Sequence, residues 1–421
     1  MRGCTFWFSR PAESVNVQAM SSEANPPLPK RLGSIDVYRG FVMFLMMGEL
    51  FRFCAVASNL RAAGRPSGFW DVLCHHQEHV EWVGCVLHDL IQPSFSFLVG
   101  VALPFSIASR IGRGQSRIGL WFHALWRAVI LVLLGVALRS TGASQTNWTL
   151  EDTLSQIGLG YPFLFALGLA SRRVQWGALG VILVGYWAAF ALYTPGQGFD
   201  FSTVGVSADW LREHGHTGFA SHWQKNGNLA WAADREILNW FPRAKEWLYN
   251  GGGYSTLSFI PTLATMLLGV LAGDVLRNSP SHLRRMTWLL IAGAVGLASG
   301  WLLDNLGICP IVKRIWTPSW VLFSGGWCFL LMAAFYALIE MLHLSRTLFP
   351  LQVIGMNSIA AYCIAHLFDG FIAKNLKTHL GHQVFQFFGP AYEPFLHGAA
   401  TFGVLWLVLL WMYRQRLFLR I

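Results

Sequence analysis

Four titratable residues stand immediately before a long apolar stretch in the first quarter of the chain. They are His79, Glu81, His88 and Asp89. No charged residue follows from Leu90 to Ser109, and roughly 20 apolar residues are enough to cross a bilayer core. Histidine can act as a base or a nucleophile near neutral pH, because its ordinary pKa is about 6.5. The pattern predicts a polar site at the mouth of a membrane helix, with His79 at the membrane–water interface.

The composition predicts an all-α, polytopic integral membrane protein. Of the 421 residues, 54% are hydrophobic and 12% are charged, and the mean hydropathy is +0.43. Soluble domains carry about 25% charged residues. The net charge of +10 comes from basic residues between apolar stretches, as the positive-inside rule places them. We therefore expect the lipid bilayer, and not nucleic acid, as the partner of this charge.

The apolar stretches predict about ten membrane spans. They cover approximately 33–57, 90–109, 120–140, 153–170, 174–192, 254–272, 286–303, 316–339, 349–368 and 395–413. An even number puts both termini on one side, and Arg-rich loops make that side cytoplasmic. We expect a multi-pass protein of the inner (cytoplasmic) membrane.

We expect the chain to consist of one disordered tail and one transmembrane domain. Residues 1–29 are polar and non-periodic, which predicts a disordered cytoplasmic tail, and Met20 is an alternative start. Residues 30–421 form the single domain, with outer loops at about 58–85 and 195–250. The second loop is too long for a plain connector, so we expect a lid or a small binding subdomain there.

Cysteine and histidine spacing gives little evidence of a metal site. The seven Cys are scattered and form no C-x-x-C pair. Cys74 and Cys85 fall in or near one predicted outer loop and Cys309 in another, which leaves room for a disulfide whose pairing the sequence does not decide. The adjacent His75 and His76 lack a standard ligand spacing. We expect no metal.

Several ionisable or polar residues lie inside predicted spans, where they are costly and often functional. Asp36 and Arg39 are three residues apart, so they share a helix face and can pair. Such a pair is equally consistent with a structural role in helix packing and with a role in catalysis. Glu49, nearer the outer end of the first span, is the better site candidate. Asn357 and His366 occupy apolar surroundings in the ninth span.

Ordered motifs resemble the heparan-α-glucosaminide N-acetyltransferase family, of which the chain would be a bacterial member. The main one is H-x-x-W-x-G-x-x-x-x-D-L-[IV]-x-P-x-F-x-F-x-x-G, matched by His79, Trp82, Gly84, Asp89, Leu90, Pro93, Phe95, Phe97 and Gly100. Others are R-L-x-S-[IL]-D-x-x-R-G up to Gly40, K-R-I-W-T-P-S-W from Lys313 and G-M-N-S-I-A-A-Y from Gly355. The resemblance covers nearly the whole chain from Arg31.

The resemblance implies transfer of an acetyl group from cytosolic acetyl-CoA to the amino group of a terminal glucosamine across the membrane, with His79 as the active-site histidine. Acyl transfer needs a base or nucleophile and donors for the oxyanion. The catalytic candidates are His79, Asp89 and Glu49. The supporting candidates, including oxyanion donors, are Asp36, Arg39, His88, Asn357 and the amides of Gly251–Gly253. The candidates for binding the coenzyme's phosphates are Arg110, Arg113, Arg117 and Arg277. Each of them can equally be a basic residue that only marks a cytoplasmic loop.

His79 and Asp89 are ten residues apart, which would be about 15 Å on one helix. We therefore expect no direct contact unless the chain folds back before the span, and we expect Asp89 to orient another polar group such as Arg39.

The acceptor, N- against O-acylation, and an acetyl-histidine intermediate against direct transfer all stay open. The oligomeric state does too, with a homodimer among the alternatives. A competing interpretation is a secondary transporter or exporter of a sugar or glycan, with Asp36, Arg39, Glu49, Asp89 and His366 in proton coupling. No inverted repeat with paired broken helices supports it.

Overall fold

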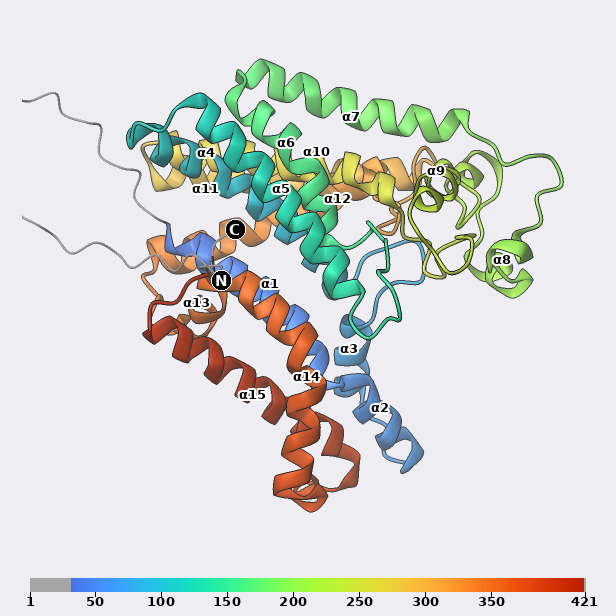
Figure 1. Cartoon of the computed structure of the whole chain (residues 1–421), viewed down its shortest axis with the longest axis vertical. Coiled ribbons are helices and arrows are strands. Elements are labelled where there is room, and N and C mark those ends of the chain that lie inside the picture. Colours follow the sequence, from blue (N-terminus) through green and yellow to red (C-terminus); the bar gives the residue numbers. More distant parts are fainter. Residues whose placement is uncertain (1–31, 420–421) are drawn as a thin grey trace, which may run out of the picture.

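The computed structural model describes residues 32–419 and is helical throughout (Figure 1). The predicted tail at 1–29 lies outside the described residues. The α-helices are α1 (Gly33–Met47), α2 (Phe53–Ala62), α3 (Gly68–Gln77), α4 (Ile91–Gly112), α5 (Arg117–Arg139), α6 (Thr153–Leu169), α7 (Arg172–Leu192), α8 (Ala208–His214), α9 (Leu229–Ile237), α10 (Phe259–Asn278), α11 (His282–Asn305), α12 (Pro318–Tyr336), α13 (Phe349–Met356), α14 (Ser358–Leu380) and α15 (Glu393–Arg414). The short turns that matter below are η1 (Gly48–Phe51) and η2 (Leu87–Leu90).

The prediction of a polytopic, all-helical membrane protein is confirmed. Within the described residues, eight helices are long and apolar enough to cross a membrane, or nine if α13 and α14 form one span bent by 83°. The fourth predicted span, 153–170, corresponds to α6, which has only 17 residues and is not among them. The count therefore differs from ten because one helix is short and another span is broken.

The first span is not the continuous helix that the sequence predicts over 33–57. α1 ends at Met47, η1 follows, and Arg52 adopts a left-handed backbone conformation with φ of 49°. The chain then restarts as α2. This break places Glu49 on a turn at the end of α1, with a side chain that is 62% exposed.

The helices form two groups. Figure 1 shows α1, α13, α14 and α15 together, beside a larger group made of α4 to α7 and α10 to α12. Close contacts require glycine: a methyl group on Gly100 of α4 would lie 1.8 Å from Met266 O of α10, and one on Gly40 of α1 would lie 1.8 Å from Leu351 O of α13. Small residues let backbones approach in this way. Both glycines belong to the sequence motifs, so these positions act in packing.

The long segment 195–250 folds into short helices and packs on the loop that carries His79. Trp82 is buried, and its indole nitrogen donates to Trp223 O at 3.2 Å. The indole nitrogen of Trp210 donates to Glu81 at 2.7 Å. The segment thus supports one side of the loop at 78–86.

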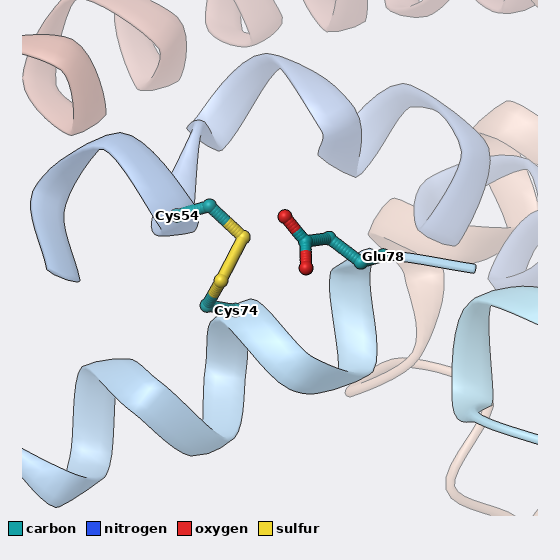
Figure 2. Close-up of side chains that lie close together, drawn as sticks. All are labelled: Cys54, Cys74 and Glu78. Atoms are coloured by element: carbon teal, nitrogen blue, oxygen red, sulfur yellow. A yellow bond between two sulfur atoms is a disulfide. The ribbon is translucent and has the colours of Figure 1, made fainter. Parts of the chain in front are cut away.

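A disulfide joins α2 and α3 through Cys54 and Cys74 (Figure 2). Of the three cysteines that the sequence places in predicted outer loops, Cys74 forms a disulfide, and Cys85 and Cys309 are free. α3 packs against α2, so that Cys54 and Cys74 lie 4.5 Å apart between Cα atoms, which sequence spacing could not show. Figure 2 also shows the Glu78 side chain extending toward this disulfide.

Replacing both Cys54 and Cys74 with serine should destabilise the protein. The bond closes a loop across a sequence separation of 20, and a loop of that size is worth about 3 kcal/mol through restriction of the unfolded chain. Thermal unfolding of the purified variant in detergent measures the effect. A Cys85→Ser variant is the matched control and should unfold as the wild type does; equal stability of all three proteins would remove the disulfide from the account.

Candidate active site

His79 and Asp89 are in direct contact. His79 Nδ1 lies 2.7 Å from Asp89 Oδ1, and the Asp89 side chain is fully buried. The expectation that these two residues stay apart is wrong, as is the pairing of Asp89 with Arg39. Asp89 instead orients His79, whose side chain remains 38% exposed.

The contact forms because the chain between His79 and Val86 is not helical. Gly84 has a φ of 115°, a left-handed value that favours glycine, and its amide donates to Ile311 O at 3.0 Å. Val83 pairs with Val312 in an isolated antiparallel bridge. The segment folds back on residues 311–314 and returns His79 to the start of η2, where Asp89 also accepts from the Val86 amide at 3.2 Å.

Lys313 is a candidate site residue that the sequence interpretation missed. Its ammonium group lies 3.1 Å from both Asp89 Oδ1 and His79 Nδ1, and the side chain is 6% exposed. A buried acid of this kind needs a compensating charge. Lys313 therefore completes a buried group of three with His79 and Asp89.

Arg314, the next residue, fixes the backbone around this group. Its guanidinium donates to Val80 O at 3.1 Å and to Gly252 O at 2.7 Å. Thr317 then caps α12, and Pro318 occupies its first turn. The motif string from Lys313 to Trp320 thus combines two site residues with a helix start.

Burial lowers the pKa of the His79 imidazole below its ordinary value, and the Lys313 charge lowers it further, whereas Asp89 acts in the opposite direction. The net shift is downward, so His79 is neutral at about pH 7. The Nδ1–H group of His79 donates a hydrogen bond to Asp89 Oδ1, which leaves the lone pair of the ring on Nε2. His79 is thus prepared to act as a base or as a nucleophile.

Replacing Lys313 with methionine should move the acid limb of the pH–rate profile to higher pH. Loss of the cation removes a cause that lowers the pKa of His79 and leaves Asp89 to raise it. Only the neutral imidazole reacts, so activity at about pH 6 should fall more than activity at about pH 8. Rates measured across this range test the shift, and an unchanged limb would show that Lys313 does not tune His79.

A second imidazole–carboxylate pair lies beside the first. His88 Nε2 is 2.9 Å from Glu49 Oε1, and the ring centroids of His79 and His88 are 4.7 Å apart. The break after α1 presents Glu49 to His88. The side chain of Gln77 holds this turn, because it donates to Gly48 O at 2.7 Å and accepts from the Phe53 amide at 2.8 Å.

Both pairs face one cavity of about 700 Å³. Its wall includes His79, His88, Glu49 and Lys313, together with residues of α1, α4, α5, α14 and the turns around 151–153 and 250–254. The acidic residues of the wall are Glu49, Glu151, Asp152 and Asp369, and the arginines are Arg52 and Arg139. Burial raises the pKa of the Glu151 carboxyl.

The structure places other predicted site residues away from this cavity. Asp36 and Arg39 form an ion pair at 3.7 Å near the start of α1, about 20 Å along the helix from Glu49. The Asn357 amide donates to Leu417 O at 2.9 Å and accepts from the Leu419 amide at 3.1 Å, so it ties the bend between α13 and α14 to the C-terminal segment.

The amides of Gly252 and Gly253, predicted as oxyanion donors, already have acceptors. Gly252 N donates to Asn250 Oδ1 at 2.8 Å, and Gly253 N donates to Asn250 O at 2.9 Å. Gly252 lines the cavity with its backbone, but its amide is engaged within the turn.

The four predicted phosphate-binding arginines lie at the other end of the helices. Arg110 and Arg113 end α4, Arg117 begins α5, and Arg277 ends α10, which runs beside α4 in the same direction. Arg110 is bonded to His123 at 2.6 Å and to Gln115 at 3.1 Å. About 30 Å of helix separates Arg110 from Asp89.

Together, the cavity offers a neutral imidazole held by a buried acid and a lysine, a second imidazole with its own carboxylate, and an acidic wall. Such a set can accept a proton, carry an acyl group on nitrogen and attract a cationic amine.

Comparison with known proteins adds a relationship over most of the chain. No family model matches it. The chain is 23% identical over 398 residues to heparan-alpha-glucosaminide N-acetyltransferase from Homo sapiens, a match covering 85% of this chain and 56% of the human protein. The corresponding protein from Mus musculus is 22% identical over 372 residues, with 79% and 53% covered. The chain spans about half the length of these curated relatives. It is a distant homologue of heparan-alpha-glucosaminide N-acetyltransferase.

Proposed function

We propose that the chain is a membrane-bound acyltransferase that moves an acetyl group from acetyl-CoA to an amino sugar or a glycan bearing one. The observation that carries the proposal is the contact of His79 with Asp89 and Lys313 at a cavity, in a chain distantly related to an N-acetyltransferase.

His79 is the residue that handles the acyl group. Its Nε2 lone pair either attacks the thioester carbonyl or takes the proton of the acceptor. Asp89 fixes the ring and its tautomer, and burial, assisted by the Lys313 charge, lowers the pKa of the imidazole. Both supporting side chains are buried, so the group stays in one arrangement through the reaction.

The acidic wall of the cavity supports an amine as acceptor. Glu49 and Asp369 offer carboxylate acceptors for an ammonium group, on a wall that also carries Arg52, Arg139 and Lys313. Arg139 and Asn250 on the same wall offer donors for hydroxyl oxygens. An amino sugar satisfies both kinds of contact.

The donor would enter from the opposite end of the helices. In the proposal, both termini and the Arg-rich loops face the cytoplasm of the inner membrane, and Arg110, Arg113, Arg117 and Arg277 bind the phosphates of the coenzyme. The acetyl group must then reach His79 along part of α4, because about 30 Å of helix separates the two ends.

The test uses purified protein in detergent with radiolabelled acetyl-CoA and glucosamine. Label should enter the sugar in the wild-type reaction. No label with coenzyme still bound would mean that the acceptor is wrong, and no label without coenzyme binding would favour a transporter.

A further inference from the structure

His88 has no role in the proposed function, and its partner Glu49 enters only as a carboxylate of the cavity wall. The position of His88 is left open by the motif that contains His79 and Asp89. Its side chain is 7% exposed, yet it lines the cavity, and its ring is tilted by 49° against the His79 ring. Two imidazoles therefore face one cavity, each held by its own carboxylate.

The hydrogen bonds leave the lone pair on a different nitrogen in each of the two rings. His88 donates through Nε2 to Glu49, so its lone pair is on Nδ1, whereas His79 keeps its lone pair on Nε2. The carboxylates differ as well. Asp89 is fully buried, and Glu49 is 62% exposed, so a proton taken by His88 can pass to water through Glu49.

The chemistry of an amine acceptor calls for a second base. An amine that arrives as an ammonium group loses one proton before it can attack and a second when the amide forms. One proton is taken up by the departing thiolate, and the other must leave the site. A single imidazole that is also occupied with the acyl group cannot serve both steps.

We propose that His88 is a catalytic residue that takes the first proton from the acceptor's ammonium group, with Glu49 holding its ring. The N–H bond breaks, its electron pair stays on the amine nitrogen, and the proton binds His88 Nδ1. The amine then forms the N–C bond, and the bond from the acetyl carbon to the coenzyme sulfur, or to His79 Nε2, breaks with its electron pair. The second N–H proton is taken up by the group that leaves, the sulfur in the first case and Nε2 of His79 in the second. This inference rests on the proposed function and fixes the acceptor as an amine.

The test compares the acetyl-transfer rates of His88→Ala and wild-type protein toward glucosamine at about pH 6 and about pH 9. An amino group of this kind titrates at about pH 8, so it needs a base at the lower pH and none at the higher. We expect a loss of about 100-fold or more at pH 6, which shrinks toward the wild-type rate at pH 9.

Other groups near His88 also titrate or carry charge. They are Glu49 on η1, His76 on α3, His79, Asp89, Lys313 and His366 on α14. Their contributions enter both proteins, so the ratio of the two rates at each pH isolates His88. His88→Gln, which keeps a hydrogen bond to Glu49 but cannot accept the proton in this way, guards against loss of folding. His75→Ala is the matched histidine control.

A defect in both His88 variants that is equal at the two pH values would assign His88 a positioning role and overturn the proposal, as would full activity at pH 6. Wild-type protein that transfers no acetyl group at either pH would instead overturn the proposed function, and this role of His88 with it.

Discussion

Replacing His79 with alanine should lower acetyl transfer by about 1,000-fold or more while leaving the protein folded. His79 carries the only lone pair in the described site that Asp89 and Lys313 both position, and loss of a general base alone costs about 10²–10⁴ in rate. Its side chain is partly exposed, so truncation leaves no large buried cavity. The measurement is label transfer per mole of protein, with thermal unfolding in parallel.

His75→Ala is the control for this variant, since His75 lies on α3 away from the cavity wall and is exposed. It should retain the wild-type rate. Turnover that persists in His79→Ala would remove His79 from the mechanism, and the contact with Asp89 would then have to be read as structural.

Replacing Asp89 with asparagine should lower both stability and activity. Lys313 would keep its buried charge without a counter-charge, and breaking a buried ion pair from one side costs about 3–5 kcal/mol. His79 would lose the acceptor that fixes its tautomer, so transfer should fall by about 100-fold. Thermal unfolding and label transfer, measured on the same preparation, separate the two effects.

The double variant Asp89→Asn with Lys313→Met tells a charge effect from a catalytic one. Removing both charges should restore much of the stability, because an apolar group of similar size needs no counter-charge. It should not restore transfer, because His79 still lacks its partner. A stability loss in Asp89→Asn with unchanged turnover would make Asp89 a structural residue only.

The sequence predicted the helical membrane class and the positions of the apolar helices, but not the breaks after α1 and α13. Apolar length decides these features, and it is local. It also identified His79, Asp89, Glu49 and His88 as site candidates, because ionisable residues at the end of a membrane span are uncommon. The role of each remains a prediction.

Contacts between distant segments could not be predicted in the same way. His79 and Lys313 are 234 residues apart in the sequence. The turn at Gly84, which brings His79 to Asp89, produces no periodic pattern of residues from which it could be predicted. The same holds for the disulfide, which depends on the packing of α3 against α2.

One signal in the sequence did point to Lys313. The ten-span topology puts residues 304–315 in an outer loop, where the positive-inside rule disfavours basic residues. Lys313 and Arg314 stand there side by side, and their position is explained by Asp89 and the backbone of the loop at 78–86. Basic residues on the wrong side of a topology are thus worth testing as site residues.

Reconstitution in sealed vesicles tests the central claim most directly. Radiolabelled acetyl-CoA is supplied on one side only, glucosamine is enclosed on the other, and the sugar is analysed for label and for an amide bond. We expect labelled N-acetylglucosamine on the side without coenzyme when the vesicles hold wild-type protein, and none when they hold the His79→Ala variant. Glucosamine that crosses the membrane unlabelled, with acetyl-CoA unconsumed, would contradict it and identify a transporter.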